Sequence, residues 1–340
     1  MAELLAVRGL RVEFATDRGP AQVLDGINLD VAAGEVVGLV GESGCGKTTL
    51  ARAILGILPA GAARIRGGEV RFKGRDLLRE DPRAVNDHVR GRAITFIPQD
   101  PFTSFSPVFP VGTQIMDLMK WKSPQAESGR PPALLRRYPR TRYRADRDAV
   151  LETLRAVQIP EPGRALRRLP HEFSGGQRQR LMIAMALLPQ PDLVIADEPT
   201  TALDVTIQAQ ILKLLRALVK ERGVSVLFTT HDLGTAHEIC DRVVVMYAGQ
   251  EMEAAPTDAF FSRPAHPYTR RLLASVPGPD GEIRDIPGEV PSLVAPPPGC
   301  RFHPRCDYAT TECGVDRPGP RTLGEDHGVR CHHPVVGAGT

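Results

Sequence analysis

The feature that most constrains this 340-residue chain is the glycine-rich stretch Gly41-Glu-Ser-Gly-Cys-Gly-Lys-Thr48. It follows the apolar run Glu35-Val-Val-Gly-Leu-Val40 and precedes an Ala- and Leu-rich segment over 48–58, which predict a buried strand and a helix. In that context the pattern G-x-x-x-x-G-K-[ST] forms a phosphate cradle from backbone N–H groups. A flexible glycine turn without a ligand is the alternative, and the flanking strand and helix argue against it.

We therefore expect the loop and the first helical turn to bind the phosphates of a nucleotide. Lys47 would reach the β- and γ-phosphates, and Thr48 would ligate Mg²⁺. The predicted contacts are Gly41, Ser43, Gly44, Cys45, Gly46, Lys47, Thr48 and Thr49.

The apolar pattern predicts an α/β fold. Residues 4–40 alternate apolar runs with turns, which indicates an antiparallel β meander at the N-terminus. Buried strands over 193–196, 225–229 and 242–247 are separated by helices, which indicates a parallel sheet covered on both faces. Beyond Arg263 the chain becomes rich in proline and cysteine, and we expect an irregular C-terminal appendage.

The composition and the apolar runs argue against several classes of protein. The chain is 24% charged and 42% hydrophobic, and Lys plus Arg minus Asp plus Glu is 43 − 40 = +3, so global disorder and bulk-charge binding of nucleic acid are both disfavoured. The longest apolar runs, such as Leu181-Met-Ile-Ala-Met-Ala-Leu-Leu188, fall short of the roughly 18 residues that span a bilayer. The N-terminus lacks a signal-peptide pattern, which predicts a cytoplasmic chain.

A basic stretch interrupts the polar, proline-rich region. Between residues 120 and 147 nine Lys and Arg residues face only Glu127 and Asp146. We interpret this stretch as a solvated insertion in preference to a dedicated binding surface.

Two acids follow the predicted strand 193–196. At the carboxyl end of a parallel strand, Asp197 is placed to hold Mg²⁺, mainly through water, and Glu198 to orient and polarise the attacking water. A solvated turn before Pro199 would explain the same residues, but their pairing with Lys47 favours catalysis.

The run Phe173-Ser174-Gly175-Gly176-Gln177 opens another predicted helix and is a second exposed-amide anion site. With it, the chain resembles the ATP-binding-cassette (ABC) ATPases, whose signature is usually Leu-Ser-Gly-Gly-Gln. The resemblance extends from about residue 4 to residue 262. It implies a RecA-like P-loop nucleotide-binding core with an N-terminal antiparallel β subdomain and a helical subdomain over about 100–188.

The resemblance assigns further roles. Phe14 matches the aromatic that stacks on adenine, and Gln99 matches the glutamine that senses Mg²⁺ and the partner subunit. Asp204, in Thr201-Ala-Leu-Asp, matches the loop that crosses the dimer interface, and His231 matches the switch histidine at the γ-phosphate.

These ATPases close head to tail, so the resemblance implies a dimer with composite sites. One subunit supplies Lys47, Thr48, Gln99, Asp197, Glu198 and His231, and the other supplies Ser174 and Gly176, flanked by Gly175 and Gln177. Thr48, Gln99 and Asp197 would hold Mg²⁺.

The C-terminal side resembles the appendage of bacterial dipeptide and oligopeptide importer ATPases. The residues that carry this resemblance are His266-Pro-Tyr-Thr-Arg-Arg-Leu-Leu273, Ile286-Pro-Gly-Glu-Val-Pro-Ser-Leu293 and Gly299-Cys-Arg-Phe-His-Pro-Arg-Cys306. It implies a nucleotide-binding domain over 1–262 and an importer-type extension over 263–340. Importers of nickel, glutathione and antimicrobial peptides share the appendage, so they remain alternatives.

Four cysteines crowd this extension with the spacing C-x5-C-x6-C-x17-C, at Cys300, Cys306, Cys313 and Cys331. Four thiolates can bind a [4Fe-4S] cluster or one Zn²⁺ ion, and spacing alone does not choose between them. Some members of the resembled subfamily carry an iron-sulfur cluster here, so we rank the cluster first, free thiols second and zinc third. We expect a structural cluster far from the γ-phosphate.

The sequence thus predicts an Mg²⁺-dependent ATPase that powers a peptide importer from the cytoplasmic face of a bacterial membrane. The implied partners are a second ABC ATPase subunit, identical or not, two membrane-spanning permease subunits and an extracytoplasmic substrate-binding protein, with no direct nucleic-acid contact. A soluble ABC ATPase acting on nucleic acid or ribosomes is the competing class, and an inactive regulatory cassette conflicts with the intact site residues.

Overall fold

The computed structural model describes residues 3–126, 138–201, 203–276, 285–324 and 326–335. These residues belong to two compact units. The first unit combines Met1–Leu78 with Phe228–Thr340, and the second is Arg79–Leu227. The phosphate-loop sequence and the cysteine-rich extension therefore lie in the same unit, although more than 200 residues separate them.

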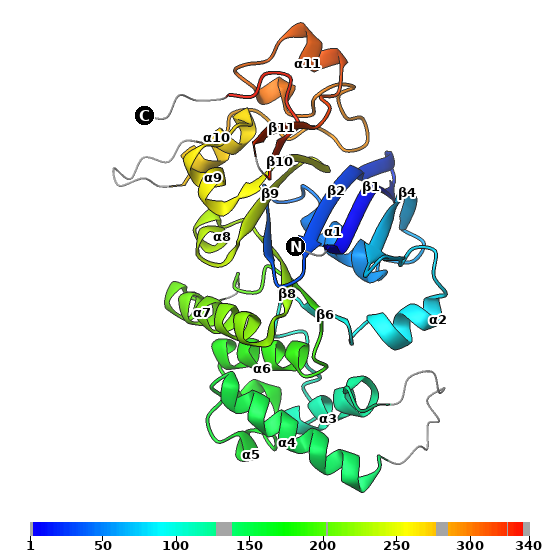
Figure 1. Ribbon diagram of the computed structural model, residues 1–340, viewed down its shortest axis with the longest axis vertical. Coiled ribbons are helices and arrows are strands. Elements are labelled where there is room, and N and C mark those ends of the chain that lie inside the picture. The colour runs from blue at the N-terminus through cyan, green and yellow to red at the C-terminus, as the bar shows by residue number, and fades with distance from the viewer. Residues whose placement is uncertain (1–2, 127–137, 202, 277–284, 325, 336–340) are drawn as a thin grey trace. The chain divides into compact units, whose positions relative to one another are not determined.

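The first unit begins with a four-stranded antiparallel sheet in the order β2-β1-β4-β5 (Figure 1). In β1 residues 4–7 are all buried, and beyond the register shift between Val7 and Leu10 burial alternates, with Leu10 and Val12 buried and Arg11 exposed. The predicted N-terminal antiparallel subdomain is confirmed. The strands are β1 (Glu3–Thr16), β2 (Gly19–Ala32), β4 (Ala63–Phe72) and β5 (Arg75–Asp76).

A second sheet of the first unit supports the glycine-rich loop. β3 (Val36–Val40) is buried throughout and pairs in parallel with β9 (Arg242–Tyr247). β10 (Gln250–Pro256) lies antiparallel to β9. The helices of this unit are α1 (Lys47–Leu55), α8 (Leu233–Ile239), α9 (Thr257–Ser262), α10 (Pro267–Ala274) and α11 (Thr311–Val315), with a 3₁₀ turn at His303–Arg305.

The C-terminal appendage is more regular than the sequence predicts. Besides α10 and α11 it contains β11 (Arg321–Gly324) and β12 (His327–Val329). β12 pairs antiparallel with β10, and β11 pairs with β12, so the appendage extends the sheet that carries β3. Strands of three and four residues are too short to show an apolar period, which is why the sequence pattern misses them.

The second unit is built from a parallel strand pair and a stack of helices. β6 (Ile94–Ile97) pairs in parallel with β7 (Leu193–Asp197). α3 packs on α4, α4 on α6 and α6 on α7. The helices are α2 (Pro82–Ala84) with a π turn at Val85–Val89, α3 (Val111–Lys122), α4 (Arg140–Ala156), α5 (Pro162–Ala165) with a 3₁₀ turn at Pro170–Glu172, α6 (Gly175–Leu187) and α7 (Val205–Arg222).

Helix and strand positions largely follow the sequence pattern. β8 (Ser225–Thr230), which crosses the division between the units, begins at the predicted residue. α4 starts at Arg140, and its first turns are polar and carry no apolar period from which the sequence could predict them. None of the described helices is long and apolar enough to cross a membrane.

Candidate nucleotide site

The glycine-rich loop connects β3 to α1 in a conformation that depends on glycine. Gly41 has φ +150° and Gly46 has φ +111°, which side-chain-bearing residues rarely adopt. A Cβ atom at Gly41 would lie 2.1 Å from the carbonyl oxygen of Met246, and one at Gly46 would lie 2.9 Å from that of Val23. The sequence therefore fixes a tight loop that leads directly into the N-terminus of α1.

Lys47 is the first residue of α1 and folds back over the loop. Its Nζ donates to the carbonyl oxygens of Gly41, at 2.8 Å, and Glu42, at 3.3 Å, and the residue is only 5% exposed. Both acceptors are uncharged. A phosphate oxygen can displace them because hydrogen bonds between charged partners are roughly twice as strong.

The remaining loop residues differ in exposure. Ser43 and Gly44 are exposed, and Thr48 and Thr49 are half-buried on the first turn of α1. Burial raises the pKa of the Cys45 thiol above its ordinary value, although nearby Lys47 opposes the shift. Cys45 therefore offers a ligand its backbone and not a thiolate.

Two further predicted contacts lie in the first unit. Phe14 is half-buried in β1, opposite Ala21 of β2 and Ala63 of β4. Its small neighbours leave part of the ring accessible, as stacking on a base requires. His231 follows β8 and is exposed.

The second unit brings the predicted catalytic residues together. Asp197 ends β7 and is 3% exposed. The Gln99 side chain donates from Nε2 to Oε2 of Glu198 at 3.2 Å, and the Thr201 hydroxyl donates to the same oxygen at 3.1 Å. Glu198 also adopts φ +46°, a strained conformation that is concentrated at functional sites.

The signature residues form the start of α6. The Ser174 hydroxyl accepts a hydrogen bond from the Gln177 N–H at 3.3 Å, and the Gln177 side chain accepts one from the Ser174 N–H at 3.2 Å. This capping box satisfies two backbone N–H groups at the start of α6, and Ser174 itself is exposed. A Cβ at Gly176 would lie 2.7 Å from Cγ2 of Ile207, so this glycine lets α6 approach α7, and Gly175 is half-buried beside it.

Asp204 has a structural task as well. Its side chain caps α7 by accepting from the Ile207 N–H at 3.0 Å. The expected interface loop 201–204 is described except for residue 202. Sequence reasoning assigned Asp204 only a role between subunits and missed this cap.

The structure thus divides the predicted site between the two units. The glycine-rich loop, Phe14 and His231 belong to the first, and Gln99, Asp197, Glu198, Asp204 and the signature residues belong to the second. Sequence reasoning missed the contact of Thr201 with Glu198 and the contact of Glu42, whose backbone N–H donates to the Tyr268 hydroxyl at 3.1 Å. A tyrosine 226 positions away leaves no signal in the loop motif itself.

The four clustered cysteines line one pocket of the first unit. Cys300, Cys306, Cys313 and Cys331 share it with His266, His303, His332 and His333, among others. Burial, reinforced by the neighbouring thiols, raises the pKa of Cys300 to about 11 and that of Cys331 to about 12. Within the described ranges no three His, Cys, Asp or Glu side chains are arranged to hold a metal ion.

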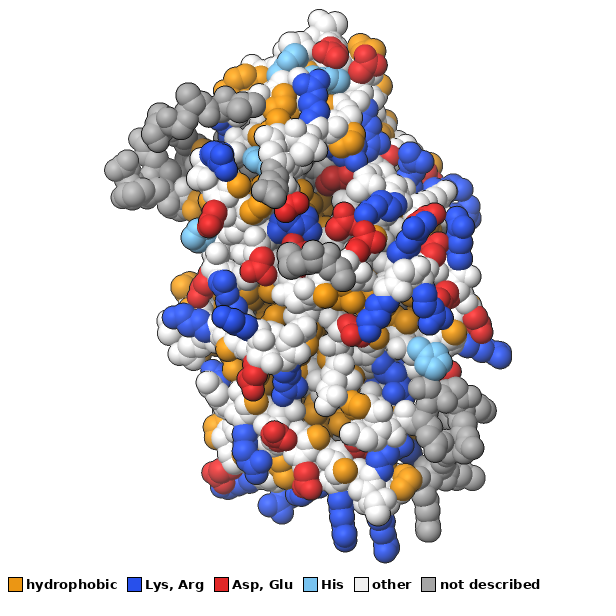
Figure 2. Space-filling model, in the orientation of Figure 1, with side chains coloured by type: hydrophobic (Ala, Val, Ile, Leu, Met, Phe, Trp, Pro, Cys, Tyr) orange, Lys and Arg blue, Asp and Glu red, His pale blue; other side chains and the backbone are white. Residues whose placement is uncertain are grey.

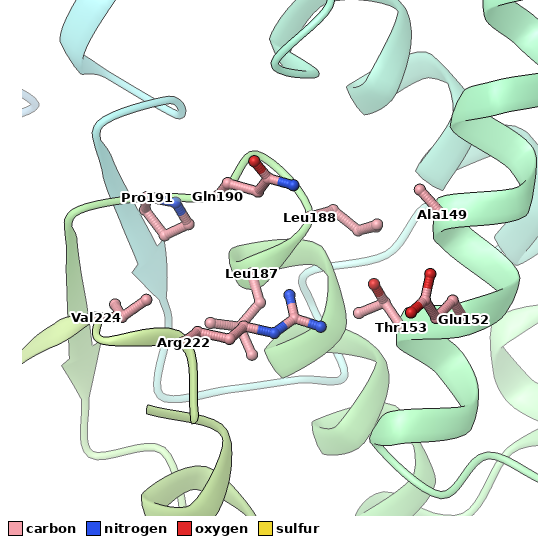
Figure 3. Close-up of a pocket in the computed structure, with 9 residues that line it drawn as sticks. All are labelled: Ala149, Glu152, Thr153, Leu187, Leu188, Gln190, Pro191, Arg222 and Val224. Atoms are coloured by element: carbon pink, nitrogen blue, oxygen red, sulfur yellow. The ribbon is translucent and has the colours of Figure 1, made fainter. Parts of the chain in front are cut away.

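A separate pocket lies in the second unit (Figure 3). It encloses about 860 Å³, counting space open to solvent, and its described lining contains none of the predicted site residues. The lining comes from α4, from the residues before β7 and from the residues before β8. Because these residues precede β7 and β8, the pocket lies at the amino ends of the two strands. Open α/β sheets bind ligands at the carboxyl ends of their strands, which is the opposite edge.

The basic stretch 120–147 is described except for 127–137. Lys122 donates to the carbonyl oxygens of Asn86 and Arg90, at 2.7 and 2.9 Å, and Arg142 donates to that of Lys120 at 2.6 Å. Part of the charge therefore holds α3 and α4 in place. Figure 2 shows Lys and Arg side chains at the lower end of the molecule, where α4 and α5 lie, and the exposed ones on α4 include Arg140, Arg144 and Arg147.

Comparison with known proteins assigns the class. The family model described as ABC transporter matches residues 24–201, and the chain belongs to this family of ATPases. A second model, described as the C-terminal region of oligopeptide and dipeptide transporters, matches residues 252–313. The predicted ABC ATPase is thereby confirmed.

Individual relatives cover nearly the whole chain. A probable peptide ABC transporter ATP-binding protein of Sinorhizobium fredii is 46% identical over 96% of this chain and 94% of its own length. The dipeptide transport ATP-binding protein DppD of Bacillus subtilis is 42% identical over 97% and 95%. The oligopeptide transport ATP-binding protein OppD of Salmonella typhimurium is 44% identical over 91% and 88%.

Solved structures support the fold. A dimeric post-hydrolysis state of the ATP-binding cassette MJ0796, bound to ADP and Pi, aligns with a TM-score of 0.62 and 24% identity over 75% of this chain and 99% of that one. The cbiO1 subunit of Clostridium perfringens aligns with a TM-score of 0.60 and 25% identity over 77% and 91%. The predicted α/β cassette fold is confirmed.

Proposed function

We propose that this chain is the ATP-hydrolysing subunit of an importer for dipeptides or oligopeptides. The observation that carries the proposal is the pairing of an ABC cassette with a C-terminal region of the peptide-transporter type in one chain. Relatives named for peptide transport, at 39–46% identity, support it. We take 1–262 as the nucleotide-binding domain and 263–340 as the importer-type extension.

The proposed ATP site uses the residues described above. The loop from Gly41 to Thr49 holds the phosphates through its N–H groups and Lys47, and Phe14 stacks on the base. Mg²⁺, when bound with ATP, neutralises charge on the β- and γ-phosphates, and Thr48, Gln99 and Asp197 are its proposed partners. Glu198 orients the attacking water, and Gln99 and Thr201 fix its Oε2. His231 contacts the γ-phosphate.

A second ATPase subunit completes the site. Ser174 and Gly176 at the start of α6 would bind the γ-phosphate of the partner's ATP, since the positive end of the helix dipole favours anions. ATP binding then closes the dimer and hydrolysis reopens it. The dimer is homo- or heteromeric.

Permease subunits would dock on the second unit. The loop between β6 and α3 exposes apolar side chains, including Phe102, Val108 at 71% and Phe109 at 55%. A loop of this kind, with large apolar groups in water, favours burial by another protein. We propose that it receives the membrane-spanning partners, which places the chain on the cytoplasmic face of the membrane. An extracytoplasmic binding protein would supply the peptide.

We propose that the cysteine pocket holds a [4Fe-4S] cluster. Four thiols line one pocket, and the Nε2 atom of His266, which lines it too, is buried without a hydrogen-bond partner in the described structure. Four thiolates match the ligand number of a [4Fe-4S] cluster as well as that of a tetrahedral Zn²⁺ site. Cys300, Cys306, Cys313 and Cys331 would hold the cluster, which would tie four chain segments together.

The decisive experiment is peptide-dependent ATP hydrolysis by the assembled importer. The tagged chain is purified from detergent-solubilised native membranes, and its partners are identified and reconstituted in liposomes with the binding protein. Dipeptides or oligopeptides should stimulate ATP hydrolysis several-fold, whereas nickel ions and glutathione should not. Copurification of ribosomes or nucleic acid in place of membrane subunits would contradict the proposal.

A further inference from the structure

An arginine of the cysteine-rich appendage binds the phosphate loop directly. Arg305 donates from Nη1 to Oε2 of Glu42 at 2.8 Å and from Nη2 to Oε1 at 3.2 Å. The two residues are 263 positions apart, and both belong to the first unit. Two parallel hydrogen bonds between a guanidinium and a carboxylate fix orientation as well as distance.

Glu42 passes this constraint on to Lys47. Its carboxylate is held by Arg305, its backbone N–H donates to the Tyr268 hydroxyl at 3.1 Å, and its carbonyl oxygen accepts from Lys47 Nζ at 3.3 Å. One residue of the loop therefore links the appendage to the ammonium group that is to meet the phosphates. A change in the Glu42 carboxylate contact would move the backbone that orients Lys47.

Arg305 is itself rigidly held. Its Nε donates to the carbonyl oxygen of Pro287 at 3.0 Å, Nη2 donates to that of Ile286 at 2.8 Å, and Nη1 donates to the Tyr247 hydroxyl at 3.2 Å. The residue is 7% exposed. Burial alone would lower its pKa, but the hydrogen bonds to Glu42 and Tyr247 outweigh that effect and raise it. The guanidinium is thus a fixed charge and not a flexible surface group.

A second arginine between Cys300 and Cys306 supports the phosphate loop indirectly, through the residues that follow β9. Arg301 is 1% exposed and donates to the carbonyl oxygen of Ala248, and the neighbouring Gly249 N–H donates to the carbonyl oxygen of Cys45 at 2.9 Å. Between the two arginines, Phe302 packs against the rings of Tyr247 and Tyr268. The segment between the first two clustered cysteines is therefore packed onto the supports of the phosphate loop.

We propose that Arg305 is a positioning residue for ATP binding, which acts through Glu42 to hold the phosphate loop and Lys47 in the binding conformation. The inference rests on the nucleotide site proposed above and goes beyond it, because it makes the appendage part of the ATPase. An ion pair that merely docks the appendage would affect stability and leave the affinity for ATP unchanged.

The test compares ATP kinetics of variants of the full chain. Arg305→Met should raise the KM for ATP about tenfold, equivalent to about 1.4 kcal/mol, while kcat changes less than about twofold. Glu42→Gln removes the charge from the other side and leaves the remaining Arg305 contacts in place, so it should raise the KM similarly. The double variant should be no worse than Arg305→Met alone, because both changes remove the same interaction. Arg305→Lys, which keeps the charge but loses the fork, should be intermediate.

Arg271→Gln is the matched control. Arg271 forms an ion pair with Asp307 in the same appendage, and this pair does not touch the loop. The KM of the Arg271→Gln variant for ATP should equal that of the parent chain. Thermal unfolding without nucleotide is measured for every variant. An unchanged KM in both Arg305→Met and Glu42→Gln, or additive effects in the double variant, would overturn the proposal.

The experiment distinguishes a loss of loop positioning from a folding defect and from a failure of peptide import. Should Arg305→Met fail to fold, Glu42→Gln alone decides, since it preserves volume and shape. The assay uses the full chain with ATP and no peptide, together with the second ATPase subunit where the dimer is heteromeric. A failure of peptide import therefore contradicts the proposed function and leaves the positioning role of Arg305 intact.

Discussion

Gln99 and Glu198 are hydrogen-bonded to each other across the ends of two adjacent parallel strands. Gln99 lies two residues after β6, Glu198 lies one residue after β7, and Nε2 of the first donates to Oε2 of the second. Because β6 and β7 pair in parallel, their carboxyl ends meet at one edge. The residue assigned to sense the metal and the partner thus touches the residue assigned to the attacking water.

Removing the charge of Glu198 should abolish turnover without abolishing binding. Glu198→Gln keeps the shape of the side chain but removes the carboxylate that orients and polarises water, so ATP hydrolysis should fall at least about a hundredfold. Mg-ATP binding, measured with a fluorescent ATP analogue, should stay within about twofold. Glu161→Gln, at the exposed start of α5, is the control and should behave as the parent chain. Near-normal turnover of Glu198→Gln would move the catalytic role to another residue.

Changing Ser174 should separate closure from nucleotide binding. Ser174→Arg places a bulky cation at the start of α6 and should block ATP-dependent dimerisation while the monomer binds ATP normally. Because Ser174 also caps α6, its loss alone costs about 1 kcal/mol of stability. Ser174→Asp retains a capping oxygen yet repels phosphate, so it should block dimerisation at an unchanged melting temperature. Each Ser174 change is combined with Glu198→Gln, and ATP-dependent dimerisation of the combined variant is measured by light scattering. Equal loss of monomer binding would show that the signature acts within its own subunit.

The fold was largely predictable because its strands and helices carry strong apolar periods. β3, β7 and β9 are continuous buried runs, and the glycine-rich loop motif fixes the connection from β3 to α1. The short appendage strands and the first turns of α4 lack such periods, and no sequence rule finds them.

The site was predictable by residue but not by contact. Motif spacing identifies Lys47, Asp197 and Glu198 as site residues. It gives no information on long-range partners such as the Arg305–Glu42 pair, since neither residue stands at a fixed position of the loop motif. The expected distance between a cluster and the γ-phosphate stays a prediction, but the segment between Cys300 and Cys306 contacts the phosphate loop through Arg305.

Glu253 should make stability depend on acid pH. It is buried, and its oxygens accept from the Ala265 and His266 N–H groups and contact His327 Nε2, each at 2.8 Å. Burial raises its pKa, but these hydrogen bonds outweigh the effect and lower it below its ordinary value of 4.5. The stabilisation is therefore complete above about pH 4.5 and is lost as the pH falls through the lowered pKa.

Glu253→Gln tests this linkage. The variant loses one acceptor oxygen and should be destabilised by about 1–3 kcal/mol at pH 7. Its unfolding free energy in urea should change less than that of the parent chain when the pH is lowered from 5 to 3. The exposed Glu289→Gln serves as the control and should follow the parent curve. An identical acid dependence in parent and Glu253→Gln chains would assign the effect to other groups.

The cysteine pocket should contain iron when the protein is purified without oxygen. The raised pKa values of Cys300 and Cys331 keep the metal-free thiols protonated at neutral pH, so cluster binding must release protons and should strengthen as the pH rises. We expect about four irons and four sulfides per chain, both lost in Cys306→Ser and retained in Cys240→Ser. Zinc without iron would show that the pocket is a zinc site and contradict the cluster. Metal-free chains with fully reactive thiols would contradict both the cluster and the zinc site.

Loss of the cluster should also weaken ATP binding, because it would disturb the Arg305–Glu42 contact. Arg305 immediately precedes Cys306, so releasing that cysteine frees the segment that holds Glu42. Cys306→Ser should therefore raise the KM for ATP in the same direction as Arg305→Met, by up to about tenfold, and combining the two should add little. Iron content and KM are measured on the same preparations. A cluster-free chain with an unchanged KM would separate the cysteines from the phosphate loop and leave Arg305 to act without them.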